Sequence, residues 1–139
     1  MRLMIFALTG FLVLISLGIG GAYFVLGIEF LVLAGGFSFV ALDGQIEYAA
    51  IDNTLRFMAG LWIMLGVGLA YCLRDLEARG AILTTLLLGF VLGGVGRLLS
   101  AFQFGMPEAM IVPTVIEFVI PPIILLLNAR ISKTLRVRA

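Results

Sequence analysis

Residues 80–127 read GAILTTLLLGFVLGGVGRLLSAFQFGMPEAMIVPTVIEFVIPPIILLL. The stretch holds two apolar runs joined by the short turn GMPE (105–108), and a run of about 20 apolar residues is enough to cross a bilayer. One charge interrupts each run, Arg97 in the first and Glu117 in the second. A charge at mid-membrane depth costs about 2.5–3.5 kcal/mol on insertion scales, so such residues persist when they pair or serve a site. Because the two have opposite sign and lie on consecutive helices, each is predicted to be the partner of the other.

The composition of the chain is that of a membrane protein. Hydrophobic residues make up 63% of the sequence and charged residues only 12%, whereas soluble domains are about 45–50% apolar and about 25% charged. We therefore predict an all-α membrane protein. A chain of 139 residues has room for one membrane domain, taken as 1–139. The net charge of +1 provides no basic surface for nucleic acid.

The chain lacks the residues that several kinds of chemistry require. The chain has no His, which excludes haem ligation by His, imidazole zinc sites and His general-base catalysis. The single Cys72 excludes an intrachain disulfide and a thiolate cluster. The glycine-rich run at 93–97 lies inside a predicted span, so it indicates helix packing rather than a phosphate-binding loop. We expect no cofactor, no metal site and no catalytic residues.

Four spans are predicted, at 5–27, 53–73, 80–104 and 110–127, and together they form a four-helix bundle. Seven basic residues fall on one side of these spans: Arg2, Arg74, Arg79, Arg130, Lys133, Arg136 and Arg138. The loops on the other side carry only acidic charges: Glu29, Asp43, Glu47, Asp52 and Glu108. The positive-inside rule then places both termini, including the basic tail 128–139, in the cytoplasm.

The segment 28–52 is apolar but is cut by charges into stretches below spanning length. Such stretches are more often interfacial or re-entrant than spanning. Leu42, Ile46 and Ala50 are spaced by four, which favours a short helix lying flat on the outer surface. We interpret the segment as a lid over the outward end of the bundle. The alternative is an interfacial anchor with no cavity beneath it.

Polar residues converge on the outward half of the predicted bundle. At 1.5 Å per residue, Arg97 and Glu117 both lie roughly 10 Å from the outer ends of their helices. Ser100 follows Arg97 by one turn on the same face. Asn53 and Arg56 enter the second span from the same side. We predict that these five residues form one outward-facing pocket with two positive charges and one negative, suited to an anionic headgroup or a small carboxylate.

A simpler interpretation also fits these residues. Arg97 and Glu117 can lock two helices together without serving a site, while Arg56 extends its charge to the membrane interface. Asp52 or Asn53 is expected to cap the start of the helix 53–73. Under this interpretation the charges are structural.

Particular motifs resemble a known family. The residues NTLRF (53–57) with Gly60, then GRLLS (96–100), then Glu117 followed by Pro121, resemble the domain of unknown function 4345 family. Its members are small bacterial four-helix membrane proteins, and the resemblance covers nearly the whole chain. It implies a four-helix fold and the bacterial cytoplasmic membrane. It implies no activity.

The sequence is compatible with three functions. Short loops, glycine-rich helix faces and missing catalytic residues favour an accessory or scaffolding subunit that packs against a larger membrane complex, or that self-associates. The grouping of Arg56, Arg97 and Glu117 favours an outer-leaflet binding or transport site for a lipid or small anionic molecule. The third hypothesis is an enzyme on a lipid-soluble substrate, with Glu117 as general acid or base. It is the weakest because no second acid or base accompanies Glu117.

Overall fold

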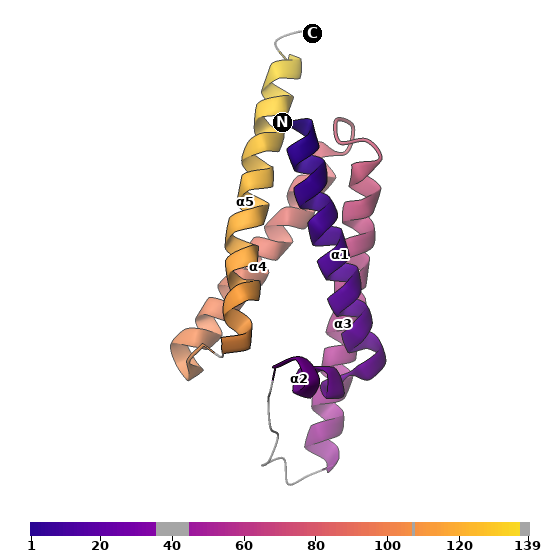
Figure 1. Ribbon diagram of the computed structural model, residues 1–139, viewed down its shortest axis with the longest axis vertical. Coiled ribbons are helices and arrows are strands. Elements are labelled where there is room, and N and C mark those ends of the chain that lie inside the picture. Colours follow the sequence, from indigo (N-terminus) through magenta and orange to yellow (C-terminus); the bar gives the residue numbers. More distant parts are fainter. Residues whose placement is uncertain (36–44, 107, 137–139) are drawn as a thin grey trace. The chain divides into compact units, whose positions relative to one another are not determined.

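The computed structural model describes residues 1–35, 45–106 and 108–136 and is all-helical over these ranges. Its helices are α1 (Arg2–Leu26), α2 (Ile28–Gly35), α3 (Gln45–Leu73), α4 (Gly80–Phe104) and α5 (Glu108–Arg136) (Figure 1). Four helices are long and apolar enough to cross a membrane, as predicted, through Arg2–Leu26, Ala49–Leu73, Gly80–Gln103 and Met110–Arg130. The short α2 is the exception.

The chain divides into two compact units, and α1 and α3 each contribute to both. Unit 1 comprises Met1–Phe11 and Gly68–Ala139, and unit 2 comprises Leu12–Val67. Most of the fully buried apolar side chains belong to unit 1: Ile5, Leu69, Cys72, Leu83, Leu87 and Ile124. Unit 2 buries Leu12, Ile28 and Ala59.

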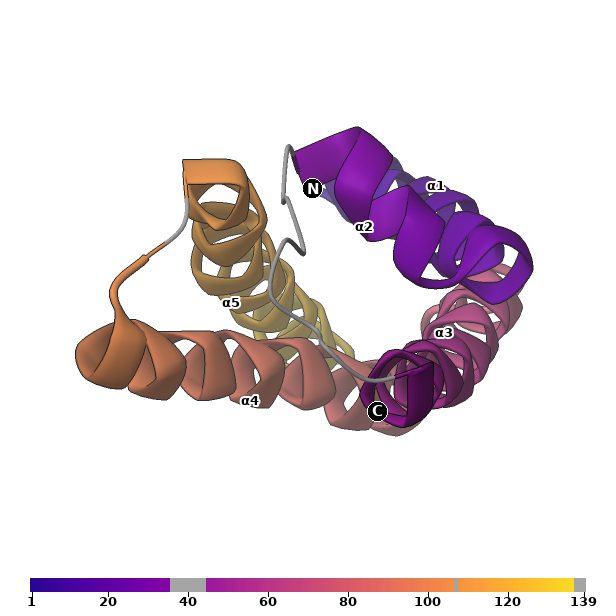
Figure 2. The same ribbon diagram turned by 90° about the horizontal axis from the view of Figure 1, so that it is seen from below.

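In unit 1, α4 and α5 pack against one another as an antiparallel pair (Figures 1 and 2). Gly94 lies at the contact, where a Cβ would come within 2.8 Å of the Phe118 ring and 3.2 Å of the Glu117 Cβ. Near the other end of the pair, the buried Asn128 side chain donates to the Gly80 carbonyl at 3.1 Å. A small residue and a buried amide therefore fix the pairing of the two helices.

The connection between α3 and α4, also in unit 1, is held by two arginines. The Arg79 guanidinium lies 3.8 Å from the centre of the Tyr71 ring and donates to the Tyr71 carbonyl at 2.6 Å. Arg2, at the start of α1, forms an ion pair with Glu77. Both arginines belong to the basic side of the predicted topology.

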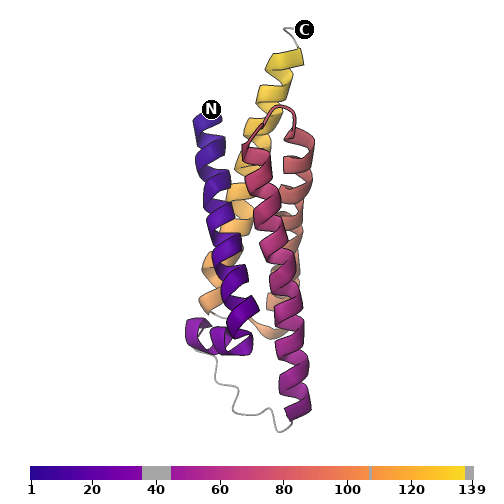
Figure 3. The ribbon, with the colours of Figure 1, turned by 90° about the vertical axis from the view of Figure 1, so that its right-hand side faces the viewer.

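In unit 2, α1 and α3 lie side by side and antiparallel (Figures 1 and 3). A Cβ at Gly20 would lie 3.1 Å from Ile63, and one at Gly66 would lie 2.9 Å from Leu17. These glycines let the two helix backbones approach closely. At the end of α1 the backbone turns through Gly27, whose φ of +58° lies in the left-handed region that favours glycine, and α2 begins at the next residue.

Two boundaries differ from the sequence prediction. Helix α3 begins at Gln45 rather than at residue 53. The predicted flat helix at 42–50 is therefore wrong from Gln45 onward, where the chain already belongs to α3; Leu42 lies outside the described residues. Helix α5 continues beyond residue 127 to Arg136. Asn128 does not end the helix, because its amide is buried and hydrogen-bonded to α4.

Candidate functional site

Arg97 on α4 and Glu117 on α5 form the predicted ion pair, and this contact is confirmed. Arg97 Nε lies 3.1 Å from Glu117 Oε1 and 3.0 Å from Oε2. The Glu117 side chain is only 4% exposed and the Arg97 side chain 30%. Gly94, one turn before Arg97, leaves the space in which Glu117 approaches α4. The pair thus neutralises a charge that would otherwise be buried alone.

The pairing leaves most of the Arg97 guanidinium available. Both carboxylate oxygens of Glu117 share the single Nε. Arg97 Nη1 has only the thioether sulfur of Met110, at 3.0 Å, which is a weak acceptor. Arg97 Nη2 has no hydrogen-bond partner among the described residues. An arginine can bind an oxyanion through two parallel N–H groups. In Arg97 neither Nη atom is bonded to a carboxylate of the described residues, so both can donate to an oxyanion.

A second charged pair, Asp52 and Arg56 on α3, holds the corner between α1 and α2. Arg56 Nε donates to Asp52 Oδ2 at 2.7 Å, across one helical turn. Asp52 Oδ1 accepts the backbone N–H of Ile28 at 2.9 Å, so a carboxylate caps the N-terminus of α2. Arg56 Nη1 donates to the carbonyls of Phe24 and Val25 at 2.8 and 2.9 Å. Each charge meets the helix end whose dipole it complements.

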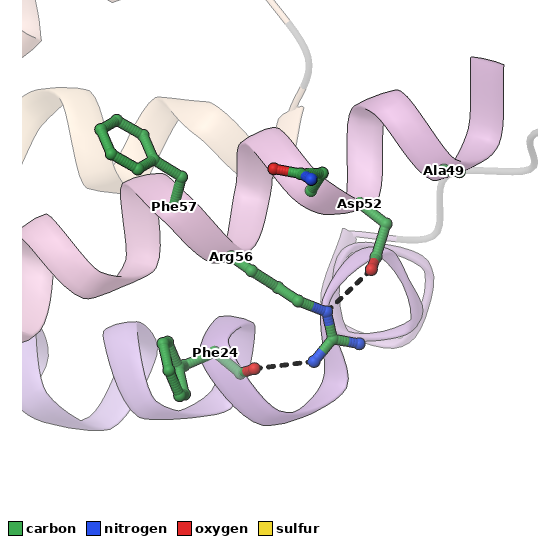
Figure 4. Close-up of a pocket in the computed structure, with 6 residues that line it drawn as sticks. Phe24, Ala49, Asp52, Arg56 and Phe57 are labelled. Atoms are coloured by element: carbon green, nitrogen blue, oxygen red, sulfur yellow. Dashed lines mark hydrogen bonds and ion pairs between the residues drawn. The ribbon is translucent and has the colours of Figure 1, made fainter. Parts of the chain in front are cut away.

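An open pocket of about 470 Å³ adjoins this second pair. It is lined by Phe24 from α1 and by Ala49, Asp52, Asn53, Arg56 and Phe57 from α3. Figure 4 shows Arg56 reaching from α3 toward the end of α1, between Asp52 and the Phe24 carbonyl. The Arg56 side chain remains 42% exposed and that of Asp52 25%. The charged groups are therefore accessible from the pocket.

The structure places the five predicted site residues in two groups. Asn53 and Arg56 line the pocket of unit 2. Arg97, Glu117 and Ser100 belong to unit 1, where Ser100 is exposed on α4 one turn beyond Arg97. Convergence of all five on one pocket stays a prediction.

The charge balance differs from the one expected. Two arginines with a single carboxylate were predicted, but Asp52 pairs with Arg56 just as Glu117 pairs with Arg97. Each group is therefore neutral as a pair. The role expected for residues 52 and 53 as caps of their own helix is also wrong, because α3 begins seven residues before Asp52 and that carboxylate caps α2 instead.

Sequence reasoning missed Asp52, Met110 and Gly94 as parts of these groups. One signal was available, because Asp52 and Arg56 are four residues apart and such residues face each other on a helix. The contacts of Met110 and Gly94 depend on the rotation of α4 against α5, which spacing along one chain does not specify.

Within the described ranges, no group of three or more His, Cys, Asp or Glu side chains is placed to hold a metal ion. No curated protein and no solved structure matches the chain. The profile of a domain of unknown function, DUF4345, matches residues 5–128, a range that includes both charged pairs. The match covers most of the 139 residues, so the chain belongs to the DUF4345 family.

Proposed function

We propose that this protein is a non-catalytic integral membrane protein of the bacterial cytoplasmic membrane, with both termini in the cytoplasm. In this proposal it packs as an accessory or scaffolding subunit against a larger membrane complex or a second copy of itself. The four apolar helices and the one-sided distribution of basic residues support the location.

The observation that carries the proposal is a face of α4 made of Gly89, Gly93, Gly96 and Ser100, here called the small-residue face. All four residues are exposed. A Cβ added at any of the three glycines would find open space within 4 Å. Gly94, which contacts α5, lies on another side of α4.

Glycines with open space around them have an energetic cost. Glycine inside a helix is destabilising by roughly 0.5–1 kcal/mol relative to alanine, so three of them weaken α4. At Gly94 the same cost is offset by the contact with α5. The three glycines of the small-residue face have no such contact to offset theirs. In membranes, small residues let the backbone of another helix approach closely, and an added helix on this face would use the glycines in that way.

The test is purification of the tagged protein from its native membrane in a mild detergent. The Gly93→Phe variant places a ring on the small-residue face. Leu92→Phe is the matched control, since Leu92 is 69% exposed and tolerates a larger side chain. We expect a stoichiometric partner with the unaltered chain and the control, and its loss with Gly93→Phe. A chain that purifies as a monomer without any stoichiometric partner, or a partner or second copy that survives Gly93→Phe, would overturn the proposal.

A second candidate function is an outer-leaflet binding or transport site for a lipid or small anionic molecule, using Asn53, Arg56, Arg97, Ser100 and Glu117. The unbonded end of the Arg97 guanidinium favours it. Arg97→Lys keeps the charge but removes the planar guanidinium that binds an oxyanion through two N–H groups. If the site binds an oxyanion, mass spectrometry of the purified protein should find an anionic lipid or metabolite that Arg97→Lys no longer retains. Equal retention by both proteins would argue against it.

A further inference from the structure

The pocket beside Asp52 and Arg56 contains both signs of charge near the start of the apolar part of α3. We infer that it binds a zwitterionic phosphate–ammonium group, namely the headgroup of a phosphatidylethanolamine-type lipid. This inference is independent of the accessory-subunit proposal, because it rests on other residues and on unit 2 alone.

The depth of the pocket follows from its place along α3. The span of α3 begins at Ala49, which itself lines the pocket. Asp52 and Arg56 lie about 5 and 10 Å further along the helix, at 1.5 Å per residue. The polar headgroup layers add about 5–7 Å on each side of a hydrocarbon core about 30 Å thick. These residues are therefore placed where headgroups give way to acyl chains.

Several polar groups of the pocket remain available for a ligand. Arg56 uses Nε for Asp52 and Nη1 for the carbonyls of Phe24 and Val25, while Nη2 has no hydrogen-bond partner among the described residues. Each Asp52 oxygen accepts one hydrogen bond, whereas a carboxylate has about four acceptor sites. The Asn53 side chain is exposed on the same pocket. The pocket thus keeps a cationic donor, an anionic acceptor and an amide.

The charges of the pocket favour a ligand that carries both a positive and a negative group. Arg56 and Asp52 cancel in charge, so a purely anionic ligand on Arg56 Nη2 would meet the nearby Asp52 carboxylate without compensation. A purely cationic ligand would meet the guanidinium in the same way. A ligand with both charges satisfies both groups. Its phosphate accepts hydrogen bonds from Arg56, and its ammonium donates to the Asp52 carboxylate and to the side-chain amide oxygen of Asn53. A primary ammonium donates three hydrogen bonds, whereas a trimethylated one donates none.

Two aromatic side chains of the pocket favour a lipid over a free headgroup. Phe24 and Phe57 both line the pocket and are 52% and 66% exposed. Figure 4 shows the Phe24 ring on α1 and the Phe57 ring on the side of α3 that faces away from α1. Phenylalanine rings at the membrane interface are buried at the boundary between the headgroups and the acyl chains. A lipid uses these rings as well as the charges, whereas free phosphoethanolamine uses only the charges.

The experiment measures thermal unfolding of the full chain, delipidated in detergent, with added lipid. The probes are phosphatidylethanolamine, phosphatidylcholine, phosphatidylglycerol and soluble phosphoethanolamine. Because a ligand that binds only the folded state raises Tm, we expect phosphatidylethanolamine to raise it by several degrees and the other three by much less. An equal rise with phosphatidylcholine, a larger rise with phosphatidylglycerol, or a full rise with phosphoethanolamine would overturn the assignment.

Variants that spare the Asp52–Arg56 pair keep the test interpretable. Asn53→Ala and Phe57→Ala remove exposed side chains of the pocket, so the lipid-free Tm should not change. Thr54→Ala is the matched control, since Thr54 is the neighbouring polar residue but does not line the pocket. We expect at least a tenfold weaker response to phosphatidylethanolamine in the two pocket variants and an unchanged response in Thr54→Ala. An unchanged response in Asn53→Ala and Phe57→Ala would refute the site.

Discussion

Arg97 holds both carboxylate oxygens of Glu117 with one nitrogen, Nε, at 3.0 and 3.1 Å. The two residues come from different helices of unit 1, so the bond ties α4 to α5 within their predicted spans. Glu117 is almost fully buried, whereas Arg97 keeps part of its guanidinium exposed. The two partners should therefore respond unequally to mutation.

Removal of Arg97 strands a buried carboxylate, and removal of Glu117 strands a cation that is partly exposed. Breaking a fully buried pair costs roughly 3–5 kcal/mol, and we expect Arg97→Ala to approach that range and Glu117→Ala to fall below it. The double variant should lose less than the sum of the two losses. Thermal unfolding in detergent measures all three. Strictly additive losses would show that the two side chains do not interact energetically.

Gly94→Ala should destabilise the α4–α5 pair, whereas Gly93→Ala should not. A Cβ at Gly94 meets the Phe118 ring at 2.8 Å and the Glu117 Cβ at 3.2 Å, while one at Gly93 finds open space. We expect Gly94→Ala to lower Tm and Gly93→Ala to leave it unchanged or raise it, since alanine gains roughly 0.5–1 kcal/mol over glycine in a helix. Equal effects at these adjacent positions would contradict the described packing.

Gly27→Ala should damage the corner between α1 and α2. The left-handed conformation costs an alanine roughly 1–2 kcal/mol, and its Cβ would in addition lie 1.8 Å from Asp52 Oδ1. We expect a clear fall in Tm for Gly27→Ala. Gly21→Ala is the control, because a Cβ there meets nothing within 4 Å. A stable Gly27→Ala variant would mean that the Asp52 cap is not fixed.

The topology can be tested with engineered cysteines at Ala78 and Glu108, both of which are exposed. The native Cys72 is fully buried, so it should contribute little labelling by itself. In intact cells an impermeant thiol reagent should label the cysteine at position 108, and it should label the one at position 78 only after permeabilisation. The reverse pattern would invert the proposed orientation.

The sequence predicted the parts of this fold that depend on length and charge. Apolar runs of sufficient length predicted four of the five helices, and matched depth predicted the contact of Arg97 with Glu117. The extension of α3 back to Gln45 was not predicted, because Glu47 and Asp52 read as loop charges. An ion pair between residues four apart, such as Asp52 and Arg56, stabilises a helix. An acidic residue with such a partner therefore does not mark a loop.

The candidate site was only partly predictable for a related reason. Residue depth along a helix follows from counting, so residues at one level can be grouped. Which of them meet depends on the rotation of each helix about its axis, and that rotation depends on small residues such as Gly20, Gly66 and Gly94. The capping of α2 by Asp52 also required the left-handed turn at Gly27, which glycine permits but does not impose.

The corner at Gly27 also has a consequence for biosynthesis. Its stabilising groups, the Asp52 carboxylate and the Arg56 guanidinium, lie 25 and 29 residues downstream in the chain. A helix of eight residues such as α2 is not stable in isolation. During translation α2 therefore stays without its stabilising partners until the ribosome has released the first turns of α3. The formation of α3 then determines when α2 becomes stable.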